Sequence, residues 1–178
     1  MIQFKKIDKR NYPNGKKIIY EYTSDKYYNV IFKEVENGWR IEFLLKYFDN
    51  PFHKYLEWNL FDDYHDHIEC YIAKFDGEEI GVVSVSHEKW NNVLRINDIH
   101  VQQSHQKKGI GSKLITFVKT RATELGVRAL VVETQTSNYP AIDFYRKHDF
   151  NLIGCDFLSY SNNDIEKKEV RIEMGLNL

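Results

Sequence analysis

The sequence is short of cysteine, and this scarcity excludes two common kinds of structure. Its only cysteines are Cys70 and Cys155, and no CxxC pair exists. A structural zinc site usually needs four closely spaced Cys or His ligands, so we expect no metal. His65 and His67 alternate, but no third ligand is evident. Two isolated cysteines in apolar runs are typical of buried, reduced thiols in a cytoplasmic protein.

Long apolar runs and an excess of one charge are also missing. No stretch approaches the roughly 20 apolar residues of a membrane helix, and the opening MIQFKKIDKR lacks the apolar core of a secretory signal. Lys and Arg number 25 against 26 Asp and Glu, which gives a formal net charge of -1. A general nucleic-acid-binding protein carries a basic excess. We therefore expect a cytoplasmic protein that binds neither membranes nor nucleic acid.

Aromatic residues, by contrast, are abundant. They make up 15% of the 178 residues, with 12 Tyr and 11 Phe. A chain this rich in aromatic residues does not stay disordered. Its length is suited to one domain with a sizeable core. We therefore expect residues 1–178 to form a single domain.

The pattern of apolar residues predicts an α+β fold. Residues 1–26 are hard to interpret, whereas two β-rich runs around Asn37-Gly38 predict a hairpin, and an acidic segment, 49–67, is expected to be helical or irregular. The later expected elements are strands at 68–75, 80–88 and 93–101, a helix at 109–125 closed by Gly126, a strand at 127–134, a helix at 139–148, and strands at 150–160 and 169–176. This order predicts a mixed, mostly antiparallel sheet flanked by helices.

A glycine-rich turn with two lysines, HQKKGIGSKLI, precedes the first predicted helix. A strand, a loop and a helix N-terminus are the arrangement that binds phosphate groups. The stretch does not fit a Walker A loop, and Leu114 stands where the dinucleotide fingerprint needs its third glycine. What remains is Q-x-x-G-x-G, formed by Gln106, Gly109 and Gly111. The alternative is a helix that merely begins with glycines and solvated lysines.

A second motif lies downstream of this turn. It is N-x-x-A-x-x-F-Y-x-x-x-x-F, formed by Asn138, Ala141, Phe144, Tyr145 and Phe150. With both motifs in this order, residues 68–176 resemble the GNAT superfamily of acetyl-coenzyme A-dependent N-acetyltransferases. The stretches KWNNVLRINDIHV and ETQTSNYPAIDFYRKHDFNLIGCDFLSY resemble its streptothricin acetyltransferase branch. The resemblance implies a GNAT-like sheet with an N-terminal hairpin extension, and acetyl-CoA as co-substrate.

The resemblance also implies roles for individual residues. Tyr145 would protonate the departing thiolate, and a bulge would expose the backbone of Ile99 and Val101 to pantetheine. A backbone N–H there would stabilise the oxyanion. The implied cofactor-binding residues are Ile99, His100, Val101, Gln106, Lys107, Lys108, Gly109, Ile110, Gly111, Ser112, Asn138 and Tyr145.

The residue that accepts the proton of the amine is less clearly marked. Asp98 and Glu133 are both candidates, and both can equally be structural carboxylates. Strand alternation puts Asn97 and Asp98 on opposite faces, so that only one of the two points at the substrate.

The acidic segment predicts the charge of the acceptor. Asp62, Asp63 and Asp66 would concentrate a cationic amine such as a streptothricin-like antibiotic, although a charge run is usually a solvated face. Two alternatives stay open: a protein lysine or N-terminus as acceptor, and a non-catalytic acyl-coenzyme A binding module. A homodimer through exposed C-terminal strands is also left open.

Overall fold

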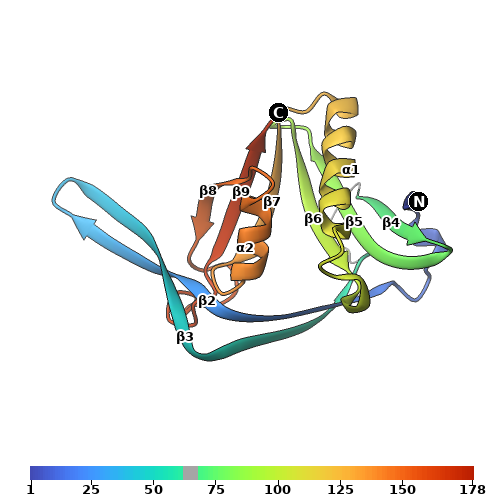
Figure 1. The fold of residues 1–178 in the computed structure, drawn as a ribbon. Coiled ribbons are helices and arrows are strands. Elements are labelled where there is room, and N and C mark those ends of the chain that lie inside the picture. Colours follow the sequence, from blue (N-terminus) through green and yellow to red (C-terminus); the bar gives the residue numbers. More distant parts are fainter. Residues whose placement is uncertain (62–67) are drawn as a thin grey trace. The chain divides into compact units, whose positions relative to one another are not determined.

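The computed structural model describes residues 1–61 and 68–178, and Figure 1 traces the ribbon. The helices and strands are β1 (Gln3–Ile7), β2 (Lys17–Val35), β3 (Gly38–Asn59), β4 (Glu69–Phe75), β5 (Glu78–Glu88), β6 (Val93–Val101), α1 (Ile110–Leu125), β7 (Ala129–Gln135), α2 (Tyr139–Arg146), β8 (Asn151–Asp156) and β9 (Arg171–Asn177). The predicted later elements are all present. β1 was not predicted, because the polar N-terminal residues give no clear pattern.

The chain divides into two compact units. Unit 1 holds Met1–Tyr20, Leu56–Val132 and Gly175–Leu178, and unit 2 holds Glu21–Tyr55 and Glu133–Met174. That residues 1–178 form one domain stays a prediction. No helix of the described chain is long and apolar enough to cross a bilayer.

The strands form a seven-stranded sheet with the order β1-β4-β5-β6-β7-β9-β8, and β2 pairs with β3 separately. β1–β4, β4–β5 and β5–β6 are antiparallel, whereas β6 and β7 run parallel. The predicted mixed, mostly antiparallel sheet is thus confirmed. Helix α1 lies along β5 and β6, as Figure 1 shows.

Helix α1 forms because its apolar residues recur at helical spacing. Leu114, Ile115, Val118 and Ala122 are all buried. Gly126 ends the helix at a φ of 64°, a left-handed conformation that favours glycine. The predicted helix and its glycine cap are therefore confirmed.

The N-terminal hairpin is longer than predicted. The structure extends β3 to Asn59, so the expectation of helical or irregular structure is wrong for residues 49–59. Aromatic contacts along the hairpin account for this: the rings of Tyr27 and Phe48 lie 4.5 Å apart, and those of Tyr22 and Phe52 lie 6.1 Å apart. Such cross-strand aromatic pairs stabilise a long β ribbon.

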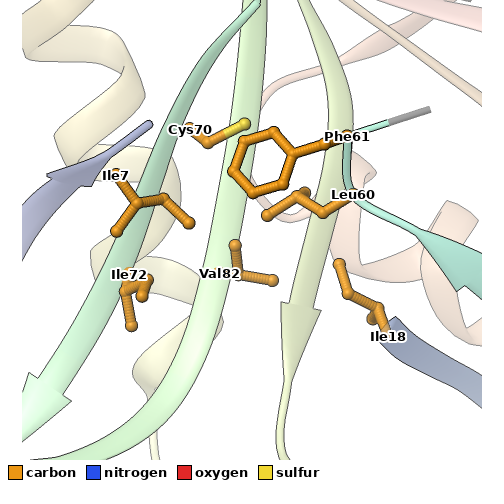
Figure 2. Close-up of a cluster of buried hydrophobic side chains, with 7 residues drawn as sticks. All are labelled: Ile7, Ile18, Leu60, Phe61, Cys70, Ile72 and Val82. Atoms are coloured by element: carbon orange, nitrogen blue, oxygen red, sulfur yellow. The ribbon is translucent and has the colours of Figure 1, made fainter. Parts of the chain in front are cut away.

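Unit 1 contains a cluster of buried apolar side chains, which Figure 2 shows. Its side chains come from β1, the ends of the long hairpin, β4 and β5, and they are Ile7, Ile18, Leu60, Phe61, Cys70, Ile72 and Val82. Burial is the main cause that raises the pKa of the Cys70 thiol to about 12. Both cysteines are free, as expected, but Cys155 is only half-buried.

Candidate active site

The predicted glycine turn joins the end of β6 to the start of α1. A short 3-10 turn, Gln103–His105, follows Val101, and Gly109 forms the N-cap of α1. Gly109 has a φ of 77°, where a side chain would be strained. A Cβ built on Gly109 meets no neighbouring atom within 4 Å. The space beside this glycine is therefore open.

The first turn of α1 has the properties of an anion site. An α-helix leaves its first N–H groups without intrahelical acceptors, and those of Ile110 and Gly111 belong to this set. The helix dipole favours negative charge at this end. Lys107 and Lys108 are exposed on the turn. Ile110 has a buried side chain, so only its backbone can face a ligand.

Gln106 ties the turn to the preceding strand. Its Nε2 donates a hydrogen bond of 3.2 Å to the carbonyl oxygen of Val101. Gln106, the first residue of the Q-x-x-G-x-G motif, thus has a structural role. Its side chain links the end of β6 to the residues that precede α1.

Strand β6 contains the bulge implied by the family resemblance. Ser84 pairs with Asp98 and Val85 pairs with Ile96, so Asn97 is the extra residue. The parallel ladder between β6 and β7 runs from the Val93 pair to the pair of Ile96 with Val132. After the bulge, the described ladder pairs of β6 up to Val101 are with β5.

The bulge also changes which way two polar side chains point. Asn97 exchanges hydrogen bonds with the Ser86 hydroxyl at 2.8 and 3.0 Å, whereas Asp98 bonds to Ser84. Ser84 and Ser86 are two residues apart on β5 and share one face of it. Asn97 and Asp98 therefore reach the same face of β5, and the expectation of opposite faces is wrong. Simple alternation fails here because the bulge inserts one residue.

Asp98 is buried, and each oxygen of its carboxylate accepts a hydrogen bond. Only 5% of the residue is exposed. The Tyr20 hydroxyl donates to Oδ1 at 2.9 Å, and the Ser84 hydroxyl donates to Oδ2. The side chain thus ties the start of β2 and the middle of β5 to the bulge.

His100 lies two residues beyond Asp98 on the same strand and pairs with Val82 of β5. The edge of its imidazole contacts the Tyr20 ring at a centroid distance of 5.6 Å. Burial lowers the pKa of His100 below its usual value of 6.5. Gly81 leaves room for this part of β6: a Cβ on Gly81 would come within 2.8 Å of the His100 carbonyl oxygen.

Unit 2 holds the other sequence-predicted residues. Asn138 caps α2, as predicted, because its side chain accepts a hydrogen bond of 3.2 Å from the Ala141 N–H. Tyr145 is 6% exposed, and its ring lies 5.5 Å from that of Phe144 and 5.8 Å from that of Phe150. The motif aromatics therefore form one cluster at the end of α2.

Glu133, the other candidate base, is held in an ion pair. Its carboxylate lies 2.7 Å from the guanidinium of Arg171, which also bonds to Glu173 at 3.0 Å. Burial first, and then the charge of Glu133, raise the pKa of Tyr160 to about 12. Within the described residues, Glu133 and Glu173 thus share the Arg171 guanidinium.

The sequence-predicted residues fall into three groups. Unit 1 holds Asp98, the β6 residues 99–101 and the turn residues 106–112, and unit 2 holds Glu133, Asn138 and Tyr145. The proposed acceptor-binding residues Asp62, Asp63 and Asp66 lie outside the described residues.

Sequence reasoning missed the hydroxyl groups that surround these carboxylates and turns. Tyr20 and Ser84 bond to Asp98, and Tyr22 lies 3.0 Å from the Ser137 hydroxyl beside the α2 cap. Tyr20 and Tyr22 alternate with the polar residues Glu21 and Thr23, which was a usable strand signal. No local pattern could have shown their partners, which are distant in sequence.

Comparison with known proteins places this geometry in a family. The model of the Acetyltransferase (GNAT) family matches residues 32–150, which is more than half of the chain. A streptothricin acetyltransferase of Escherichia coli is 35% identical over 99 residues, which cover 56% of each chain. One of Streptomyces lavendulae is 37% identical over 91 residues, which cover 51% of this chain and 48% of that protein. The chain thus spans about half the length of the curated relatives it matches.

A solved structure extends the likeness over the whole chain. It is a candidate streptothricin acetyltransferase of Bacillus anthracis str. Ames in complex with acetyl coenzyme A, with a TM-score of 0.76 and 24% identity. The match covers 100% of this chain and 98% of that one. At this level of identity the likeness shows the fold. Together with the family match, it leads to one conclusion: the chain belongs to the acetyltransferase (GNAT) family.

Proposed function

We propose that the protein transfers an acetyl group from acetyl-CoA to a primary amine of a small cationic acceptor of the streptothricin type. The observation that carries this proposal is the pairing of two features in unit 1. The left-handed Gly109 opens the start of α1, and the ladder of β6 with β7 ends at Ile96. The glycine turn at the start of α1 suits a pyrophosphate. The part of β6 beyond its ladder with β7 suits an extended chain such as pantetheine.

The turn would hold the cofactor through its backbone. The first N–H groups of α1 would bind the pyrophosphate, and Lys107 and Lys108 would add counter-charge. The residues around Ile99 and Val101 would pair with pantetheine and offer an N–H to the carbonyl oxygen. Donors of this kind contribute about 3–4 kcal/mol in acyl transfer. When bound, acetyl-CoA supplies an acetyl group activated as a thioester.

Tyr145 would give its phenol proton to the departing sulfur. Its burial favours this role, because a hydrogen bond acts more strongly where water is excluded. Asn138 would contact pantetheine as well as cap α2. Both assignments follow the downstream motif, in which these two residues lie seven positions apart.

The acceptor would be a cation attracted by acidic residues. Asp62, Asp63 and Asp66 would raise the local concentration of a polycationic amine, as a charged surface does for any oppositely charged ligand. The streptothricin acetyltransferases among the relatives support an acceptor of that class.

A panel of amines tests the proposal. Release of free thiol from acetyl-CoA is measured with streptothricin, a polyamine and a lysine-containing peptide. Fastest turnover of streptothricin or the polyamine is the expected result. Turnover of the peptide alone would replace the small acceptor by a protein lysine. Tight binding of acetyl-CoA with no thiol release on any amine would instead indicate a binding module.

A further inference from the structure

The polar side chains at and after the bulge of β6 differ in the hydrogen bonds that they make. Asn97 is engaged with Ser86 through both polar atoms of its amide. Asp98 accepts hydrogen bonds on both oxygens. His100, by contrast, has no hydrogen-bond partner on either ring nitrogen within the described part of the chain.

This contrast helps to identify the residue that accepts the proton of the amine. Both oxygens of the buried Asp98 carboxylate already accept a hydrogen bond from a hydroxyl group, which ties this side chain to Tyr20 and Ser84. The Glu133 carboxylate lies 2.7 Å from the Arg171 guanidinium and is held in an ion pair. Both candidate carboxylates are thus already engaged by other side chains.

We propose that His100 is the general base, and that Asp98 is a positioning residue that holds Tyr20 against the His100 ring. This inference rests on the proposed acetyltransferase function and deepens it. His100 lies on β6 between Ile99 and Val101, the residues proposed to hold the thioester. The imidazole ring of His100 therefore belongs to the strand that would hold the acetyl carbonyl of the thioester.

The ionisation state of His100 suits this role. Its imidazole is half-buried, and burial keeps its pKa below 6.5, so that the ring is neutral near neutral pH. A neutral imidazole can accept a proton, whereas an imidazolium cannot. In the described part of the chain, the titratable groups on this face include Asp98 on β6, the Tyr20 hydroxyl on β2, the Cys70 thiol on β4 and Lys5 on β1, which is in register with His100 through Ile72 and Val82.

The proton transfers balance as follows. The amine nitrogen bonds to the acetyl carbon, and its proton passes to an imidazole nitrogen of His100. The carbon–sulfur bond breaks, and the thiolate takes the proton of Tyr145. The imidazolium then releases a proton to water and the Tyr145 phenolate recovers one. The products are an amide and free coenzyme A.

The dependence of kcat/KM on pH tests the assignment. In the wild type, kcat/KM should fall as pH drops through the lowered pKa of His100, because protonation removes the base. His100→Gln should lose this acid limb and reduce kcat/KM by about 10²–10⁴-fold near neutral pH. Its activity should recover as rising pH deprotonates the free amine. Acetyl-CoA affinity, measured by calorimetry, should stay unchanged because the β6 backbone is retained.

Two variants serve as controls. His87→Gln removes an imidazole that bonds to Asn92 in the turn before β6, and it should keep the acid limb. Asp98→Asn should also keep the limb if Asp98 only positions Tyr20. The inference is overturned if His100→Gln keeps the acid limb of kcat/KM unchanged. It is also overturned if this limb disappears in Asp98→Asn but not in His100→Gln.

A measurement without turnover separates this inference from the proposed function. The His100 ring resonance, assigned by its loss in His100→Gln, is titrated by NMR and should have a pKa below 6.5. A ring that titrates at or above that value overturns the base assignment even in an active enzyme. If no amine releases thiol from the wild type, the acetyltransferase function itself fails, whatever the NMR titration gives.

Discussion

The Tyr20 hydroxyl donates a hydrogen bond of 2.9 Å to Asp98, a residue 78 positions away in the sequence. Because Asp98 is only 5% exposed, loss of this bond removes a donor from a buried carboxylate. Tyr20→Phe should therefore lower the free energy of unfolding by about 1–3 kcal/mol. Urea unfolding measures the change. Tyr47→Phe, at an exposed position of β3, is the control and should change it by less than about 0.5 kcal/mol.

Gly109→Glu should abolish acetyl-CoA binding. The substitution puts a side chain and a negative charge beside the start of α1, where pyrophosphate is proposed to bind. Gly126→Glu is a matched control, because Gly126 has a similar φ of 64°, open space around it and a place at the other end of the same helix. Calorimetry should show binding in the Gly126 variant only. Equal affinities in two folded variants would refute the pyrophosphate assignment.

Tyr145→Phe should lower kcat by about 10²–10⁴-fold and leave acetyl-CoA affinity nearly unchanged. The ring still packs against Phe144 and Phe150, and only the proton donor is lost. Steady-state kinetics and calorimetry measure the two quantities. Tyr139→Phe removes a hydroxyl from the first residue of α2 and should retain turnover. Full activity of the Tyr145 variant at every pH would remove it from the mechanism.

Asp62, Asp63 and Asp66, changed together to Asn, should raise the KM for a cationic acceptor and leave acetyl-CoA binding nearly unchanged. The effect should shrink with added salt, because the screening length is only about 10 Å at 0.1 M. Kinetics with a polyamine at low and high salt measure it. An unchanged KM at low salt would mean that the acidic residues form an ordinary solvated surface.

Glu69 should make the fold sensitive to acid. Arg121 donates two hydrogen bonds to its carboxylate, at 2.8 and 2.9 Å, and these are the first cause that lowers the pKa of Glu69 from 4.5 to about 2. The folded pKa lies below the unfolded one, so this stabilisation is complete above about pH 4.5 and is lost as pH falls toward about 2.

Glu69→Gln should flatten the fall in unfolding free energy across that pH window. It should cost no more than about 1 kcal/mol near neutral pH, since solvent screens the pair. Thermal unfolding at several pH values measures both effects. Glu124→Gln, which removes the other partner of Arg121, is the control. If both variants keep the wild-type slope, Glu69 does not contribute to acid unfolding.

The parts of the fold that could be predicted from the sequence are those with local signals. Gly109 and Gly126 mark the ends of α1, and Asn138 marks the start of α2, because caps depend on neighbouring residues. The second half of β3 could not be predicted in this way, since its strand is stabilised by ring contacts with β2 rather than by its own pattern.

The candidate site was predictable only in outline. Two motifs located the turn and Tyr145, but the partners of Asp98 are a tyrosine from another strand and a serine directly opposite on β5. Period-two alternation also gave the wrong faces at Asn97, because a bulge has no consistent signature in a single sequence.

The bulge at Asn97 means that β6 is one residue longer than the stretch of β5 it pairs with. A residue adds about 3.3 Å to a strand, so β6 must absorb this surplus length by arching. A related sequence that lacks one residue here would keep every other ladder pair and lose the arch. A one-residue gap at this point in an alignment would therefore mark a chain with the same fold and a straight strand, in which the pairing of β6 with β7 continues past Ile96.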